Sequence, residues 1–354
     1  MAETINRIIV IGTSAGGVEA LTRLVSDLPE DMSAAVFIVL HIPANSSGVL
    51  PKLLGRTARM PVSHPLDGDP IQAGHIYVAP PDHHLLLRSG TIHVSSGPKE
   101  NSHRPAIDPL FRTAARNYGA RVIGVILTGN LDDGSAGLLM IKRHGGLAVV
   151  QSPTDAQFPS MPASAIDSVD VDYVQPLSQI GPLLQSLANA PAPVPSDVSP
   201  DTELDRTRED DRIAFDSEAD SDAHAAARDY EVGRPSVYAC PDCHGVLWEI
   251  QEGDVLRYRC RVGHAYTVEN LLSAQEHSLE DALWAALRSL EETSSLAWRM
   301  ELRAAERGHA HGRKYFRERA IAADARALVI RQAIERKLIA EPGAPNDDIP
   351  YAEK

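Results

Sequence analysis

The sequence of 354 residues has few cysteines, no long apolar run and an excess of acidic over basic side chains. Its three cysteines cannot all pair within one chain, which disfavours a disulfide framework and favours a reducing compartment. No apolar run approaches the roughly 18 residues that a membrane span needs, and the first residues lack the basic and apolar regions of a signal peptide. The formal net charge of −14 disfavours a nonspecific nucleic-acid binder. We therefore expect a cytoplasmic protein with neither a nucleic-acid partner nor membrane insertion.

Residues 1–190 alternate short apolar runs with helix-like stretches, which is typical of βαβ units and a mostly parallel sheet. The predicted strands are Ile8–Ile11, Ala35–Leu40, Ile76–Ala79, Val122–Leu127 and Ala148–Gln151. The predicted helices are Val18–Ser26, Val49–Thr57, Pro109–Asn117, Ser135–His144 and Leu177–Leu187. A hairpin is predicted over Pro81–Ser96, with its turn at Ser89 and Gly90. The expected fold class is α/β, a three-layer doubly wound sheet.

The rest of the chain divides by composition. Residues 191–234 are Pro-rich and then strongly acidic, so we expect a disordered linker. Residues 235–268 contain all the cysteines, residues 269–340 read as amphipathic helices broken at Gly308 and Gly312, and residues 341–354 as a flexible tail. Leucines recur at helical spacing on one predicted face, namely Leu271, Leu272, Leu279, Leu283, Leu287 and Leu290.

The glycine-rich turn after the first strand carries the strongest functional signal. Ser14 stands between Gly12 and Gly16, where a tight strand–turn–helix connection exposes a serine hydroxyl at a helix N-terminus. A dinucleotide-binding turn is the alternative, but it needs glycine at the position of Ser14 and an acidic residue after the second strand. The second strand ends instead in His41, which favours a serine hydrolase.

A histidine and a carboxylate join this serine at the carboxyl ends of the predicted strands, where catalysis gathers in a doubly wound sheet. His41 can accept the serine proton, and a carboxylate from the turn at residues 128–134 can orient the imidazole. The order along the chain is Ser, His, Asp, whereas the α/β-hydrolase order is Ser, Asp, His. The shared turn therefore does not imply that fold.

Five sequence blocks in one order resemble the catalytic domain of the chemotaxis protein-glutamate methylesterases, CheB, over residues 6–166. They are Ile11–Gly17, Val39–Pro43, Ile76–His84, Arg104–Phe111, and Val125–Gly129 with Asp133–Gly137. The resemblance implies hydrolysis of glutamyl γ-methyl esters on methyl-accepting chemoreceptor-like proteins, with release of methanol, and also glutamine deamidation. No receiver domain precedes the blocks, so we expect the stand-alone form.

Carried over by motif, Ser14 is the nucleophile, His41 the general base and Asp133 the orienting acid, with no cofactor needed for catalysis. Asp133 is chosen over Asp132 because it directly precedes Gly134. An oxyanion donor is assigned to the backbone amide of Asn130. The family usually has Gly-Met-Gly in that turn, where this chain has Gly129–Leu131, so a non-catalytic signalling adaptor that binds receptor-like helices is the alternative.

The cysteines form a second candidate site. Cys240, Cys243, Cys260 and His264 are two short-spaced pairs of the ligand types that a structural zinc uses. Strands predicted over Val246–Ile250 and Val255–Arg259 make a zinc-ribbon-like hairpin. His244 is a competing ligand, and three metal-free cysteines are the alternative.

This Cys-rich segment also resembles a tail found on some stand-alone members of the same family. With the helices that follow, it is expected to serve docking or self-association. The alternative is that the leucine face packs on the ribbon or on the second helix.

Overall fold

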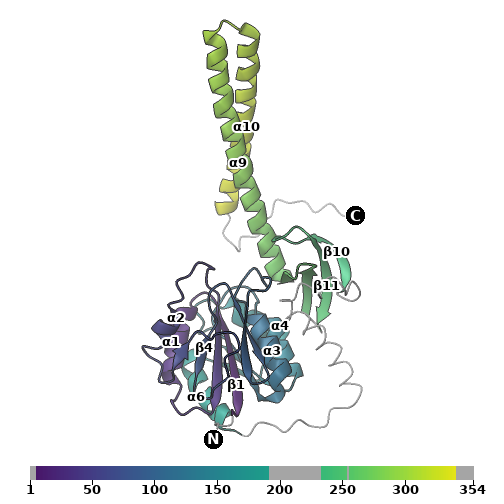
Figure 1. Cartoon of the computed structure of the whole chain (residues 1–354). Helices are drawn as coiled ribbons and strands as arrows, with labels where there is room; N and C mark the ends of the chain where they lie inside the picture. The colour runs from purple at the N-terminus through teal and green to yellow at the C-terminus, as the bar shows by residue number, and fades with distance from the viewer. Residues whose placement is uncertain (1–4, 191–232, 253–254, 340–354) are drawn as a thin grey trace. The chain divides into compact units, whose positions relative to one another are not determined.

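The computed structural model describes residues 5–190, 233–252 and 255–339 of the chain (Figure 1). They fall into two compact units, Met1–Leu272 and Ser273–Lys354, and the boundary lies within one long helix. The predicted linker, apart from its last two residues, and the predicted tail at 341–354 lie outside the described residues.

The first unit is built on a seven-stranded parallel sheet with the order β3-β4-β2-β1-β7-β8-β9. Its strands are β1 (Arg7–Thr13), β2 (Ala34–Leu40), β3 (Val62–Ser63), β4 (Ile76–Val78), β7 (Val122–Ile126), β8 (Leu147–Gln151) and β9 (Tyr173–Gln175). The central strands are buried along their whole length. Such strands have apolar side chains on both faces, which explains the continuous apolar runs of the sequence.

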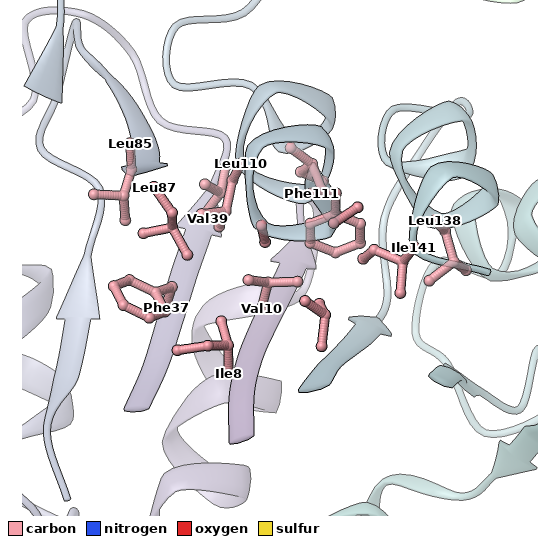
Figure 2. Close-up of a cluster of buried hydrophobic side chains, with 14 of the residues drawn as sticks. Ile8, Val10, Phe37, Val39, Leu85, Leu87, Leu110, Phe111, Leu138 and Ile141 are labelled. Carbon is pink, nitrogen blue, oxygen red and sulfur yellow. The ribbon is translucent and has the colours of Figure 1, made fainter. Parts of the chain in front are cut away.

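Helices cover both faces of this sheet, which confirms the expected α/β class. They are α1 (Gly17–Asp27), α2 (Leu50–Leu54), α3 (Ile107–Tyr118), α4 (Ser135–Arg143), α5 (Ser160–Ser168) and α6 (Leu177–Asn189). Because side chains alternate along a strand, Ile8 and Val10 face the core under α3 and α4. Figure 2 shows this core, to which Phe111 of α3 and Ile141 of α4 contribute. Ile9 and Ile11 face the second core, under α1 and α6.

The strand order changes direction at β1. The chain first adds β2, β3 and β4 on one side of β1, and then β7, β8 and β9 on the other. In open α/β sheets such a switch point leaves a crevice at the carboxyl ends of the strands. The turns after β1 and β7 therefore lie side by side, which positions the site described below.

The predicted hairpin is present as β5 (His84–Arg88) and β6 (Thr91–Ser95), with the predicted turn. The sequence prediction missed β3, β9 and α5. The two strands contain only two and three residues, too few to form a pattern. In α5, Pro162 occupies the first turn, where a missing N–H costs no hydrogen bond.

A second sheet in the same unit is antiparallel, with the order β10-β11-β12-β13. Its strands are β10 (Arg234–Ala239), β11 (Val246–Glu252), β12 (Val255–Cys260) and β13 (Ala265–Thr267). We call these four strands and their turns the Cys-rich module. The two inner strands were predicted, whereas β10 and β13 were not, and β10 begins at the last residue assigned to the linker.

The second unit is a hairpin of two helices, formed by α9 (Val268–Glu306), which begins in the first unit, and α10 (Ala310–Ile339). Glu301 of α9 accepts hydrogen bonds from Arg313 and Arg317 of α10. Gly308 has a φ of 70° between the helices, as expected of a break, but Gly312 lies inside α10. The predicted break at Gly312 is therefore wrong, because one glycine inside a helix costs only about 1 kcal/mol.

The predicted leucine face is only partly buried. Leu283, Leu287 and Leu290 pack against α10, so packing on the second helix accounts for them. Leu272 and Leu279 are exposed, at 61% and 55%.

Among the described helices, none combines the length and the apolar character needed to cross a membrane.

Candidate active site

Ser14 lies in the turn between β1 and α1. Its backbone amide donates to the carbonyl of Thr128 at 3.1 Å, which joins this turn to the one after β7. Gly16 has a φ of 73° and caps α1. This left-handed conformation is easy only for glycine, so the tight turn depends on this residue. Ser14 itself is half-buried.

His41 directly follows β2 and lies beside this turn. Parallel pairing puts Thr13 opposite Leu40, and the His41 amide donates to the Thr13 carbonyl at 3.2 Å. The imidazole is 6% exposed, and its Nε2 lies 2.7 Å from Oδ2 of Asp133. Its Nδ1 is buried and has no hydrogen-bond partner among the described residues. Nδ1 is therefore the atom that can accept a proton.

Asp133 is the buried acceptor of four hydrogen bonds. Besides His41, the donors are the backbone amides of Ile107 and Asp108, at 2.7 and 3.2 Å, and the side chain of Asn101 at 2.8 Å. Burial alone would raise the pKa of Asp133, but the hydrogen bond and positive charge of His41, with the other donors, hold it well below its ordinary value. The carboxylate thus stays ionised beside the imidazole.

The neighbouring carboxyl groups titrate differently. Burial raises the pKa of Asp132 to about 6, although Thr267 and Asn270 donate to it. Burial and the charge of Asp133 raise the pKa of Asp108, whose Oδ1 accepts from the amides of Gly134 and Gly137. Of these three carboxyls, Asp133 is the one held ionised, and it alone contacts His41.

His103 was missed as a site residue by the sequence analysis. Its ring stacks on that of His41 with 3.8 Å between centroids and 23° between planes. Burial, followed by the positive charge of His41, lowers the pKa of His103 to about 4, so it covers His41 as a neutral ring. Its position just before the Arg104–Phe111 block was the only signal in the sequence.

The turn after β7 packs against Ser14. A Cβ built on Gly129 would lie 3.0 Å from Cβ of Ser14 and 2.8 Å from Cε of Met161, so this position has no room for a side chain. The next residue, Asn130, is exposed, and no described residue accepts a hydrogen bond from its amide. The Ala15 amide likewise has no acceptor in the described part of the chain. Both N–H groups are free to bind an anion.

Leu131 occupies the position where the resembling family usually has glycine. Its φ is 62°, so the backbone is left-handed at a residue that carries a side chain. For a side chain with a Cβ this conformation costs roughly 1–2 kcal/mol. The side chain at this position is therefore accompanied by backbone strain.

Two further polar side chains near the site have structural contacts. Arg104 donates to Asp82 and to the carbonyls of Ser96 and Gly97, which makes it a residue that holds the loop before α3. His84 is buried in β5 and hydrogen-bonded to the carbonyl of Pro98 and the amide of Ala106.

The four predicted metal ligands come together in the Cys-rich module. The ligand atoms of Cys240, Cys243, Cys260 and His264 all lie within 4.8 Å of one another. Nδ1 of His264 is 3.5 Å from Sγ of Cys260 and 3.7 Å from Sγ of Cys240. His244 is exposed and outside the cluster.

A serine at a strand–helix turn, beside a buried histidine–carboxylate pair on the rim of a parallel sheet, supplies the groups that a serine esterase uses. Residues 9–184 match the model of the CheB methylesterase family. A Leptospira interrogans protein, provisionally named protein-glutamate methylesterase/protein-glutamine glutaminase, is 43% identical over 176 residues, which are 49% of this chain and 91% of that protein. The chain therefore belongs to the CheB methylesterase family.

A second relative and a solved structure agree with this family assignment. A Ralstonia nicotianae protein-glutamate methylesterase/protein-glutamine glutaminase is 40% identical over 50% of this chain and 47% of its own length. Several other relatives are likewise matched over about half of their length. The crystal structure of the Thermotoga maritima CheB methylesterase catalytic domain covers 51% of this chain and 98% of its own, with a TM-score of 0.50 and 32% identity.

The strain at Leu131 can be tested by comparing the stability of a glycine and an alanine variant at this position. Leu131→Gly is expected to be more stable than Leu131→Ala by about 1 kcal/mol, because both variants lose the side chain beyond Cβ and only alanine keeps the left-handed penalty. Chemical denaturation of the two full-length variants measures the difference. At an ordinary position alanine would be the more stable, so that order would contradict the strain.

Proposed function

We propose that this protein is a protein-glutamate methylesterase, which hydrolyses glutamyl γ-methyl esters on chemoreceptor-like proteins to glutamate and methanol. The observation that carries the proposal is the buried His41–Asp133 pair at 2.7 Å. His41 follows β2 and Asp133 lies in the turn after β7, and these two strands flank β1, which ends at the Ser14 turn. The names of its relatives support this substrate class.

In the proposed first step, Oγ of Ser14 attacks the ester carbonyl while its proton passes to Nδ1 of His41. The tetrahedral intermediate collapses when His41 returns the proton to the leaving methoxide, which departs as methanol. Water then attacks the acyl-enzyme, again losing a proton to His41, and glutamate and the Ser14 hydroxyl are released. The Asn130 amide, with that of Ala15, is proposed to bind the oxyanion.

Asp133 has two tasks in this mechanism. Its hydrogen bond keeps the proton of neutral His41 on Nε2, so that Nδ1, which has no hydrogen-bond partner among the described residues, carries the lone pair. Its negative charge stabilises the imidazolium that forms in each half-reaction. The lowered pKa of Asp133 keeps that charge in place over the whole neutral range.

Glutamine deamidation is the second proposed activity, because the relatives' names include a glutaminase. The same attack on a side-chain amide would release ammonia in place of methanol. Whether the chain works in the cytoplasm, and whether it self-associates through α9 and α10, stay predictions.

We also propose that Cys240, Cys243, Cys260 and His264 hold a structural zinc in a zinc-ribbon-like module. Zn–S and Zn–N bonds of about 2.3 and 2.0 Å in a tetrahedron separate ligand atoms by roughly 3.5–3.8 Å. Three of the six separations, at 3.5, 3.6 and 3.7 Å, fall in that range, and all six are within 4.8 Å. Four protein ligands leave no open position, so the metal would not bind the substrate or the attacking water.

The adaptor hypothesis predicts binding without turnover, and one experiment separates it from the esterase. Methanol release from a methylated receptor fragment is expected from the wild type and from Ser26→Ala, a serine-to-alanine control on the exposed side of α1. Ser14→Ala is expected to lose at least about 10⁴-fold in kcat. Equal rates for wild type and Ser14→Ala, or a folded wild type with no turnover, would favour the adaptor.

The choice of Asp133 as the orienting acid has a matched control next to it. Asp133→Asn is expected to lower kcat by about 10³- to 10⁴-fold, since an amide can hold His41 in the wrong tautomer. Asp132→Asn keeps an acceptor oxygen for Thr267 and Asn270 and does not touch His41, so its loss should stay below about tenfold. Steady-state methanol assays compare them. A larger loss for Asp132→Asn would reverse the assignment.

The zinc proposal is tested by metal analysis of the purified full chain. One zinc per chain is expected for the wild type and for His244→Ala, whose exposed imidazole lies outside the ligand cluster. Cys260→Ser is expected to lose the metal and to lower the melting temperature. Metal-free wild-type protein with an unchanged melting temperature would argue for unmetallated cysteines.

A further inference from the structure

The segment between β6 and α3 contacts both the turn that carries Asp133 and strand β13 of the Cys-rich module. On one side Asn101 donates through Nδ2 to Oδ1 of Asp133 at 2.8 Å and to Oδ2 of Asp108 at 3.1 Å. On the other side its Oδ1 accepts from the amide of Thr267 in β13 at 3.0 Å, and its own amide donates to the carbonyl of Ala265 at 2.8 Å. Asn101 is 1% exposed, so its carboxamide is held from both directions.

Buried charge fixes the Cys-rich module at this place. Glu100, next to Asn101, lies between Arg112 of α3 and Arg257 of β12, at 2.6 and 2.9 Å. All three side chains are buried. Burial works against ionisation of Glu100, but the two arginines lower its pKa to about 2, so the group stays ionised. Separation of the module would take Arg257 away from Glu100 and leave the buried carboxylate with Arg112 as its remaining arginine, which makes the contact specific.

The cluster of proposed metal ligands lies next to the residues that hold Asn101. His264 directly precedes Ala265, and the Cys260 amide donates to the His264 carbonyl at 2.9 Å. An ion bound by Cys260 and His264 would fix the start of β13, and β13 supplies both the Ala265 carbonyl and the Thr267 amide. A continuous path of bonded groups therefore runs from the ligand cluster through Asn101 and Asp133 to His41.

From this path we infer that Asn101 is a positioning residue for the catalytic carboxylate, and that the metal-loaded Cys-rich module holds it in its working orientation. The inference rests on the proposed triad and the proposed zinc, and it adds a role for the module. With Thr267 bonded to Oδ1, the Asn101 carboxamide can only point its N–H groups at Asp133 and Asp108. Without that bond the side chain is free to turn, and Asp133 loses one of its four donors.

Two adjacent residues give a matched test. Asn101 and Ser102 both have positive φ, 50° and 65°, so glycine suits the backbone at either position. Ser102 is exposed, and its side chain has no described partner. Asn101→Gly is expected to lower kcat for methanol release about 10- to 100-fold with little change in KM, the range of a lost hydrogen bond to a charged group. Ser102→Gly is expected to match the wild type.

A second readout does not depend on turnover. The proton on Nε2 of His41 should give a downfield NMR resonance, assigned by its loss in His41→Gln. We expect this resonance unchanged in Ser102→Gly and shifted or lost in Asn101→Gly. If the wild type releases no methanol, the proposed activity fails, and the resonance alone decides the positioning role. Identical spectra for the two glycine variants would overturn the inference.

The role of the module is tested in the full chain by two changes at Thr267. Thr267→Val removes the hydroxyl and keeps the amide that bonds Asn101, whereas Thr267→Pro removes both. Only the proline variant should reproduce the resonance and kcat of Asn101→Gly. Chelation of the metal should do the same to the wild type and add little to Asn101→Gly, because both changes break one path. Metal-free wild type with the original resonance and kcat would refute the coupling.

Discussion

The ionised carboxylate of Asp133 must remain charged although it is 1% exposed, and the surrounding structure is organised to meet that demand. Its donors come from His41, from the first turn of α3 and from Asn101 in the preceding loop. A buried charge without such donors would take up a proton. The pKa of the second carboxyl nearby, that of Asp108, is raised instead. Asp108 accepts a hydrogen bond from the Gly134 amide, in the turn that carries Asp133.

The same electrostatic logic explains why the Cys-rich module lies where it does. An Arg–Glu–Arg group that is removed from water contributes little net stability, but loss of one member costs about 3–5 kcal/mol. Glu100 pairs with Arg112 of α3 and with Arg257 of β12. The Arg–Glu–Arg group is therefore complete only when the Cys-rich module is in contact with α3 and the loop before it. The neighbouring residue, Asn101, accepts a hydrogen bond from Thr267 of β13 and donates one to Asp133. It therefore connects the module directly to the candidate active site.

The sequence was sufficient to predict the site residues that directly follow strands. Ser14 and His41 follow strands that pair in parallel, so their proximity was predictable once the strands were recognised. Asp133 was predicted from its motif, and its neighbour Asp132 differs from it in contacts that no local sequence pattern reveals. Asn101, His103 and Glu100 were not predicted. They lie in an irregular loop, and their partners depend on contacts such as Asn101 with Thr267, 166 residues away. The short strands β3 and β9 were missed because two or three residues form no period.

The distance along the chain between Asn101 and Thr267 also means that the two residues are synthesised at different times. A ribosome delivers residues 1–190 first, and domains of this size fold as they emerge. At that stage the sheet, Ser14, His41 and Asp133 are complete, but the strand that orders the Asn101 carboxamide has not yet been made. A nascent or truncated chain would thus carry the residues of the proposed triad without the β13 amide that binds Asn101. Full activity would then mark molecules whose synthesis has run past the last cysteine and whose C-terminal strands have docked.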